Sequence, residues 1–314
     1  MAHQHWWTQT LATDNYRSLC EQESRLRPFL ARSPQLCLRR CLSDWIVTLG
    51  QQLHLRSITR HLAVLMLDLF MERHDVPPTK LLPTALGCLV IACKFEEHEE
   101  NIPRRKNLAE VLNLCLPGVS VEILLGGDVM LQTEMQVLAG LSWDLFLPTA
   151  AHFSDYFLTL ALQEVSIPSH QGCDKLLYLR RYTSYFLELS LQDHVHLNFP
   201  PSLVAASCVS AARMCVHLPP TWPGQLQQLI GYNLQQLLPC MELLIRAYKS
   251  DRDANRQRKE QLLELSQPEI FTPSCGKYIC VESYPQNVGH ADGRCRGDPN
   301  GHNLCRPPLP SDPR

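Results

Sequence analysis

The chain has 314 residues, of which 45% are hydrophobic, so it is long enough and apolar enough to bury the cores of about two domains. Its formal net charge of -2 argues against nucleic acid or an anionic membrane as the main partner, since either would favour a basic chain. The chain lacks the roughly 18 consecutive apolar residues of a membrane span, and its N-terminus lacks the pattern of a signal peptide.

Residues 1–33 are polar apart from Trp6, Trp7 and Leu11, and they predict at most a short helix. We expect this leader to dock onto the body of the protein through the two tryptophans, because aromatic side chains of that size are costly to leave in water. The alternative is a disordered leader whose tryptophans stay exposed.

A first set of five helices is predicted between Ser33 and residue 141. Ser33 and Pro34 suit a helix start, and leucines recur with Trp45 on one helical face as far as Leu53. The remaining helices are expected over 57–73, 81–97, 107–115 and about 121–141. The third, LLPTALGCLVIACKFEE, is apolar or small almost all round, which predicts burial on every side until its charged end.

After the segment LSWDLFLPT (141–149) the pattern starts again, and no β-branched alternation indicates a strand. Helices are predicted over 150–164, 175–190, 200–218, a short stretch after 224, and 233–249. The sequence therefore predicts an all-α protein with two tandem five-helix folds, each built around a buried third helix. The predicted parts are a leader (1–33), an N-terminal fold (34–145), a C-terminal fold (146–250) and a disordered tail (251–314).

Several ordered motifs carry a family resemblance. Motifs of the first half closely resemble the cyclin box: LRRCLSDWIVTL (38–49), HLAVLMLDLF (61–70), CKFEE (93–97) and LSWDLFLPTA (141–150). Motifs of the second half resemble the second cyclin fold: PSLVAASCVSAAR (201–213) and GYNLQQLLPCMELLIRAY (231–248). Within the cyclin family, SPQLCLRR and SLQDHVHLNFPPSLVAA are most similar to segments of J-type cyclins. The resemblance implies a regulatory subunit without catalytic residues that binds and activates a cyclin-dependent serine/threonine kinase of the cell cycle.

The resemblance also implies which residues contact the kinase. Lys94 and Glu134 match a lysine and a glutamate that hydrogen-bond the kinase main chain beside its movable helix, and such charged hydrogen bonds contribute about 1.5 to 3 kcal/mol each. The matching apolar pocket, which receives a side chain of that helix, consists of Ile91, Phe95, Leu138, Trp143 and Leu145. Read without the resemblance, the same residues are solvated charges and ordinary core.

Arg39 and Asp68 match a buried ion pair that ties the first two helices of the cyclin fold together, a structural role. The first helix of many cell-cycle cyclins also bears a patch that captures substrate peptides containing Arg-x-Leu, and its matching positions are Leu38, Cys41, Leu42, Trp45 and Leu82. Thr48 replaces the acidic residue of that patch, and an arginine side chain is recognised best by a carboxylate. We therefore expect Arg-x-Leu selection to be lost, and an apolar patch with a different peptide preference remains open.

No catalytic motif occurs in a usable context, so we expect no enzyme activity, no cofactor and no metal site. The acidic cluster Glu96–Glu100 is interpreted as a solvated helix end, because its consecutive side chains point in different directions. The tail residues Cys275, Cys280, Cys295, Cys305, His290 and His302 lack the spacing of a zinc site.

Two other functions remain open. One is a cyclin-fold scaffold that activates no kinase. The other is a DNA binder similar to transcription factor IIB, although the chain lacks a basic face and a zinc ribbon.

The 14 cysteines indicate the compartment. Many of them lie within apolar helical patterns, as at positions 37, 41, 88, 93 and 208, where a free cysteine acts as a small hydrophobe. That usage favours a reducing environment. We expect a soluble protein of the nucleus and cytoplasm, with no nucleic acid and no membrane among its partners.

Overall fold

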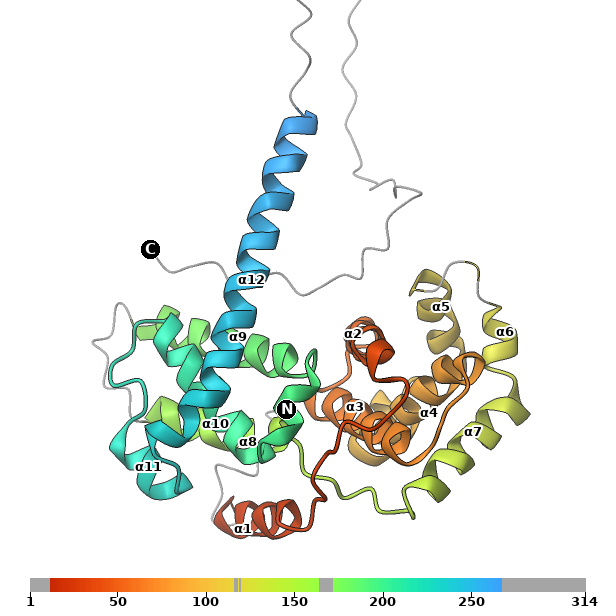
Figure 1. Cartoon of the computed structure of the whole chain (residues 1–314), viewed down its shortest axis with the longest axis horizontal. Coiled ribbons are helices and arrows are strands. Elements are labelled where there is room, and N and C mark those ends of the chain that lie inside the picture. The colour runs from red at the N-terminus through yellow and green to blue at the C-terminus, as the bar shows by residue number, and fades with distance from the viewer. Residues whose placement is uncertain (1–11, 116–117, 119, 164–171, 267–314) are drawn as a thin grey trace, which may run out of the picture. The chain divides into compact units, whose positions relative to one another are not determined.

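The computed structural model describes residues 12–115, 118, 120–163 and 172–266, and every regular element within them is a helix (Figure 1). The all-α prediction is confirmed. The chain divides at Ser250 into a first unit that holds both predicted folds and a second unit that begins at Asp251. The tryptophans of the leader and the cysteines of the tail lie outside the described residues.

The N-terminal fold has its helices close to the predicted positions. It contains α2 (Leu36–Gln52), α3 (Ser57–Arg73), α4 (Pro78–Glu96), the short 3-10 helix η2 (Glu99–Asn101), α5 (Arg105–Cys115), α6 (Val121–Leu124) and α7 (Gly127–Gly140). The single fifth helix predicted over 121–141 is wrong, since the chain breaks between α6 and α7. Gly126 adopts an extended conformation there (φ -50°, ψ 128°) and precedes the first turn of α7. Glycine is a poor helix residue, and two in succession favour such a break.

The C-terminal fold repeats the arrangement. It contains α8 (Ala150–Gln163), α9 (Gly172–Ser190), the 3-10 helix η3 (His194–Asn198), α10 (Pro201–Cys215), α11 (Gly224–Ile230) and α12 (Leu234–Ser266). The last helix is longer than the predicted 233–249. Its extension, DRDANRQRKEQLLELS, is rich in good helix formers, so a helix continues there although few of its residues are apolar.

Each fold has its own hydrophobic core, organised around the predicted central helix. In the N-terminal fold, α4 is buried on all sides from Ala85 to Leu89 and again from Ile91 to Cys93. In the C-terminal fold, α10 is buried at every residue from Ser202 to Arg213. The all-round apolar pattern therefore predicted the two central helices correctly. By length and apolar composition α4 is long enough to cross a membrane. However, 56% of its most apolar 18-residue stretch is buried inside the protein, as in a core helix.

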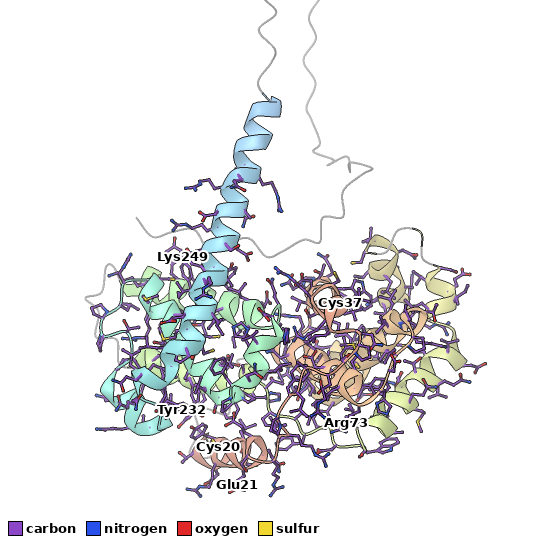
Figure 2. All side chains as sticks on the ribbon, viewed as in Figure 1. Cys20, Glu21, Cys37, Arg73, Tyr232 and Lys249 are labelled. Carbon is purple, nitrogen blue, oxygen red and sulfur yellow. The ribbon has the colours of Figure 1, made fainter. Side chains whose placement is uncertain are left out.

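Helix α1 (Ala12–Glu23) precedes the N-terminal fold in the chain but packs on the C-terminal one (Figure 1). Its Tyr16 ring packs against Phe153 and Phe157 of α8, at centroid distances of 6.1 and 5.8 Å. Figure 2 shows Cys20 of α1 close to Tyr232, which follows α11. The leader thus contributes a helix to the core of the second fold.

Polar side chains join the two folds. The Arg39 guanidinium donates to the carbonyl of Leu191 at 2.8 Å, and Gln51 donates to the Glu188 carboxylate at 2.8 Å. Arg60 reaches the other oxygen of Glu188 at 2.5 Å. These bonds hold α2 and α3 to the end of α9.

The described cysteines differ in exposure, and three of them, Cys20, Cys115 and Cys215, are half-buried. Cys88, Cys93, Cys208 and Cys240 are buried, and burial raises the pKa of their thiols, that of Cys93 to about 12. They are small core residues, as the sequence indicates. Cys37 and Cys41 differ, because both are exposed on α2, where Figure 2 labels Cys37. The helical pattern alone did not reveal this exposure.

His61 of α3 predicts a pH dependence of stability. Only 2% of it is exposed, and burial lowers the pKa of its imidazole to about 3, with Arg60 and His152 adding to the shift. Below the ordinary histidine pKa the unfolded chain therefore binds a proton that the folded chain refuses. We expect the free energy of unfolding to fall as the pH drops from about 6.5 towards 3, by about 2 kcal/mol at pH 5 from this residue. Urea titrations across that range should show a flatter pH profile for His61→Phe, and equal slopes would contradict the assignment.

Candidate functional site

The candidate site begins where α4 leaves the core. Ile91 and Cys93 are buried, whereas 45% of Phe95 is exposed and the Lys94 side chain is 54% exposed. The change from burial to exposure follows from the sequence, in which an apolar run ends in a basic and an aromatic residue. The end of α4 therefore presents a charge and an aromatic ring on the surface of a rigid element.

Helix α7 brings Glu134 to Lys94. A Cβ atom at Gly87 of α4 would lie 2.9 Å from Cγ2 of Thr133, so the two helices pack at a distance that only glycine allows without adjustment. Glu134 follows Thr133, and its carboxylate lies 2.5 Å from the Lys94 ammonium. Its side chain is only 12% exposed. The two residues that the resemblance singled out are 40 positions apart in the chain and form one ion pair.

The predicted apolar pocket residues differ in their exposure. Ile91 is a core residue at 4% exposure, Leu138 and Leu145 are half-buried, and Trp143 is 60% exposed. The Trp143 amide donates to the carbonyl of Leu138 at 2.9 Å, which fixes the turn after α7. Trp143 therefore lies at the surface beside a half-buried leucine of α7.

The backbone of this turn is strained. Ser142 and Trp143 have φ angles of 57° and 60°, in the left-handed region that residues other than glycine seldom adopt. A large exposed aromatic residue held in that conformation is a feature that core packing alone does not require.

Sequence reasoning missed three exposed apolar residues, Leu131 and Met135 on α7 and Phe146 in the segment after it, which are 61%, 47% and 44% exposed. Leu131 and Met135 are spaced by four on α7, so they share one helical face, and Met135 follows Glu134 directly. The sequence does contain a signal for this surface. Thr133 and Val137 form the buried face of α7, and the apolar pair of Leu131 and Met135 lies on the opposite face, which is open to solvent.

The acidic cluster at the end of α4 is solvated only in part: Glu99 and Glu100 are exposed as expected, but Glu96 and Glu97 are not. Glu97 is 8% exposed, and its carboxylate accepts hydrogen bonds from the Arg56 amide at 2.8 Å and from the Thr59 hydroxyl at 2.5 Å. Glu96 lies 3.1 Å from Nε2 of His152, whose Nδ1 accepts from the Thr149 amide. Glu96 and Glu97 are not solvated because their carboxylates have hydrogen-bond partners on neighbouring elements, which the local sequence does not show.

Arg39 and Asp68 form a buried ion pair between α2 and α3. The guanidinium donates to both carboxylate oxygens, at 2.8 and 2.9 Å, and the two side chains are 3% and 1% exposed. Burial raises the pKa of the Asp68 carboxyl, and the adjacent Arg39 opposes part of that shift.

Comparison with known proteins gives the family. The family model described as "Cyclin, N-terminal domain" matches residues 13–146, and that described as "Cyclin, C-terminal domain" matches residues 148–266. The chain is also 37% identical to cyclin-J of Xenopus laevis over 275 residues, which cover 86% of this chain and 70% of that protein. This chain belongs to the cyclin family.

Further relatives are of the same type. This cyclin is 38% identical to a cyclin-J-like protein of Mus musculus, over 77% of this chain and 63% of that protein. It is 37% identical to cyclin-J of Homo sapiens, over 85% and 69% of the two chains. The likeness to J-type cyclins expected from the sequence is confirmed.

Solved structures agree on the fold. A viral cyclin from herpesvirus saimiri matches with a TM-score of 0.56 at 18% identity, over 74% of this chain and 95% of that one. A chain of the yeast RNA polymerase II CTD kinase complex CTDK-1 matches with a TM-score of 0.52 at 15% identity, over 83% and 84% of the chains. The two tandem cyclin folds predicted from the sequence are therefore present.

The peptide-docking positions of this cyclin divide between surface and core. Leu38 and Cys41 of α2 are exposed, but Leu42 and Trp45 are 9% and 5% exposed and belong to the N-terminal core. Leu82 of α4 is half-buried against the same core. Thr48, which the resemblance matches to an acidic residue, donates its hydroxyl to the Asp44 carbonyl at 2.8 Å. The exposed part of the patch is thus small, and its use for peptides stays a prediction.

Proposed function

We propose that this cyclin is a non-catalytic regulatory subunit that binds and activates a cyclin-dependent serine/threonine kinase. The observation that carries the proposal is the surface formed by Lys94, Glu134, Phe95 and Trp143, here called the pair surface. It combines a charged pair that has spare hydrogen-bonding capacity with exposed aromatic residues, Phe95 at the end of α4 and Trp143 in the turn after α7. Aromatic anchors surrounded by polar groups are the usual arrangement of an interface hot spot.

The chemistry of the pair fits main-chain recognition. The Lys94 ammonium has three donors and uses one on Glu134, so it can also donate to a backbone carbonyl of a partner. The Glu134 carboxylate keeps an oxygen that can accept a backbone N–H. One ion pair can therefore satisfy both polar groups of an extended or terminating main-chain segment.

The proposed mechanism is a shift between two kinase conformations. The pair surface binds the inward position of the movable kinase helix, in which the kinase's own lysine and glutamate form the ion pair that catalysis needs. A surface that binds one of two positions populates that position in proportion to its differential affinity. All catalytic groups belong to the kinase.

The proposal is tested by reconstitution. The full-length cyclin is co-expressed with each of a panel of cyclin-dependent kinases, the complexes are isolated, and phosphate transfer to a generic substrate peptide is measured with and without the cyclin. We expect at least one kinase to co-elute and to gain activity. A kinase that binds without gaining activity would indicate a scaffold instead, and no binding by any kinase would refute the proposal.

Trp143 allows binding to be separated from stability. In Trp143→Gly the residue with φ of 60° becomes glycine, so strain is relieved while the indole is lost. We expect the free energy of unfolding to change by less than about 1 kcal/mol, because the side chain is mostly exposed. Kinase affinity should fall about 30-fold, which corresponds to a hot-spot contribution of about 2 kcal/mol. The measurements are urea unfolding and calorimetric titration with the kinase.

The control for this substitution is Trp143→Phe, which keeps an aromatic ring at the same exposed place. It should bind the kinase within a few fold of the wild type. If glycine and phenylalanine variants bind the kinase equally well, Trp143 is not an anchor of the interface.

The localisation is also a proposal. We infer that the protein acts in the nucleus and cytoplasm, where its kinase partner and a reducing environment for its free cysteines coincide. Imaging of the tagged full chain tests this, and accumulation in the secretory pathway would contradict it.

A further inference from the structure

The last turn of α4, which contributes two residues to the pair surface, is attached to both cyclin folds. Glu97 binds the start of α3, within the N-terminal fold, through the Arg56 amide and the Thr59 hydroxyl. Glu96 binds α8 of the C-terminal fold, where its Oε1 lies 3.1 Å from Nε2 of His152. The side chains of this second contact are mostly buried, at 15% exposure for Glu96 and 13% for His152. One of the two attachments of this helix end therefore depends on the second fold.

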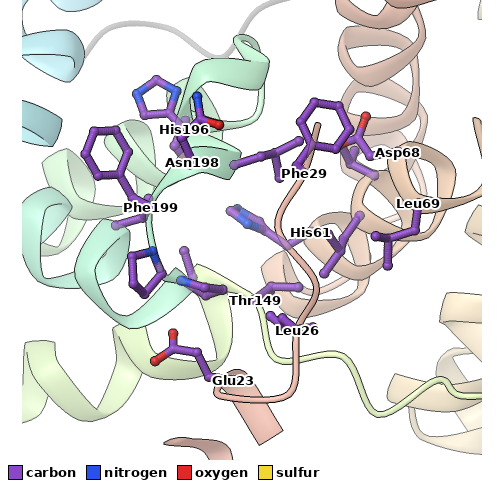
Figure 3. A pocket seen from close by; sticks show the side chains of 18 of the residues that line it. Glu23, Leu26, Phe29, His61, Asp68, Leu69, Thr149, His196, Asn198 and Phe199 are labelled. Carbon is purple, nitrogen blue, oxygen red and sulfur yellow. The ribbon is translucent and has the colours of Figure 1, made fainter. Parts of the chain in front are cut away.

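The other ring nitrogen of His152 bonds the start of α8. The Thr149 amide donates to Nδ1 at 3.1 Å, and the Thr149 hydroxyl lies 2.8 Å from the same nitrogen. A side chain in the first turn that bonds the amide just before the helix is one half of a capping box, in which glutamate or glutamine is usual. Thr149 lines a cavity between the two folds together with His61 of α3 (Figure 3). The capped end of α8 thus lies where the two folds meet.

These bonds determine the tautomer of His152. A backbone amide can only donate, so Nδ1 accepts from Thr149 and carries no proton. The proton of the neutral ring is therefore on Nε2, which donates to Glu96. A single rigid ring bonds the first turn of α8 and the last turn of α4 at the same time.

The exposed end of α4 needs such a restraint. Helix ends fray where tertiary contacts are few, and the side chains of Lys94 and Phe95 are about half exposed. Glu96 follows Phe95 directly, so a bond to Glu96 restricts the backbone that carries both residues. A binding surface that is ordered before its partner arrives loses less entropy on binding.

We propose that His152 is a positioning residue of the kinase-binding surface, through which the C-terminal fold fixes the end of α4 that carries Lys94 and Phe95. This inference rests on the function proposed for that surface. His152 is mostly buried, so it acts through Glu96 and does not need to contact the kinase itself. Without the bond, the last turn of α4 samples more conformations, and the kinase has to order that turn on binding.

Three variants separate this role from the capping of α8. His152→Glu keeps an acceptor for the Thr149 amide, since glutamate is usual at this position, but it places a second carboxylate against Glu96. His152→Gln keeps both an acceptor and a donor, so it retains both bonds. His152→Glu combined with Glu96→Gln restores a donor opposite the new carboxylate.

The first measurement needs no kinase. Backbone amide order parameters of the full-length protein are determined by NMR relaxation, in which rigid backbone gives about 0.85. In His152→Glu we expect the values of Phe95 and Glu96 to fall below about 0.7, while those of Leu86 and Leu89 in the buried middle of α4 stay unchanged. His152→Gln and the double variant should match the wild type. A loss of global stability alone would not change the order parameters of the native state.

The second measurement is calorimetric titration with a kinase that co-elutes with the wild type. We expect His152→Glu to bind about fivefold more weakly, which corresponds to about 1 kcal/mol. The glutamine variant and the double variant should bind like the wild type. If no kinase binds the wild type, the proposed function fails, and the order parameters still show whether His152 fixes the end of α4.

Two outcomes would overturn the proposal. One is a folded His152→Glu variant whose order parameters at Phe95 and Glu96 equal those of the wild type. The other is wild-type kinase affinity in that variant. If His152→Glu does not fold, Glu96→Ala removes the same bond from the side of α4 and leaves the cap of α8 intact, and the same two measurements then decide.

Discussion

The double substitution Lys94→Ala with Glu134→Ala is expected to abolish kinase activation at cyclin concentrations that saturate the wild type. In the proposed complex each residue offers a charged hydrogen bond to the kinase main chain, and such bonds contribute about 1.5 to 3 kcal/mol apiece. Losing both should weaken the affinity at least 100-fold. Stability should change little, because the pair is an exposed ion pair on the Lys94 side and contributes at most about 1 kcal/mol to folding. Calorimetric titration and a kinase assay with the same preparations give both quantities.

A matched control exists on the same two helices. Lys80 and Asp128 are exposed charges in the first turns of α4 and α7, so Lys80→Ala with Asp128→Ala removes one positive and one negative charge from the same two helices. We expect this variant to bind and activate like the wild type. Equal losses in both double variants would show that helix electrostatics, and not the pair surface, determine binding.

Charge reversal distinguishes a contact with the kinase from an internal structural role. In Lys94→Glu with Glu134→Lys the internal ion pair is retained, but the donor and acceptor offered to the partner are exchanged. If the pair only holds α4 against α7, this variant should activate the kinase normally. We expect it to fail, since the kinase main chain would then meet a carboxylate where it needs a donor. Full activity of the reversed pair would refute the assignment of these residues as kinase contacts.

The fold was largely predictable because burial leaves a periodic signal. An all-round apolar helix such as α4 has to lie in the centre of a bundle, and the same pattern at residues 201–213 identified α10. Local patterns were less informative about where a helix ends. The break at Gly126 and the continuation of α12 to Ser266 both depend on intrinsic propensity, which is weak compared with packing.

The site was predictable only in part. That Lys94 and Glu134 lie together follows from the resemblance, since nothing in the local sequence relates residues 40 positions apart. The burial of Glu97 was missed because its donors, the Arg56 amide and the Thr59 hydroxyl, come from the start of α3. The docking of α1 on the second fold was missed for a similar reason, because an apolar helical face does not specify its partner.

Two buried histidines show a third limit of sequence reasoning. His61 and His196 are 135 positions apart, and neither belongs to a motif that indicates a ligand. Only the structure shows that, among the described residues, Nε2 of each is buried without a hydrogen-bond partner. Unsatisfied polar atoms are a tertiary property, since they depend on which elements surround a side chain.

The largest expected effect on stability is at the ion pair of Arg39 and Asp68. Arg39→Met removes the donor of two hydrogen bonds and leaves the Asp68 carboxylate, at 1% exposure, without its counter-charge. A charge left alone in this way costs about 3 to 5 kcal/mol. The third bond, from Arg39 to the Leu191 carbonyl, is lost as well, so the contact between the two folds weakens. Urea unfolding should therefore show a much lower midpoint, and thermal unfolding a fall of several degrees.

The double variant Arg39→Met with Asp68→Leu separates the cost of a stranded charge from the contribution of the pair itself. An apolar pair of similar volume often replaces a buried ion pair with little loss, so we expect the double variant to recover most of the stability lost in Arg39→Met. Recovery should be incomplete by about 1 to 3 kcal/mol, because the Leu191 carbonyl stays buried without its donor. A double variant as unstable as the single one would show that the loss comes from packing of the arginine side chain and not from the unpaired carboxylate. A single variant that loses less than about 1 kcal/mol would show that water reaches Asp68, because a hydrated carboxylate does not need its partner.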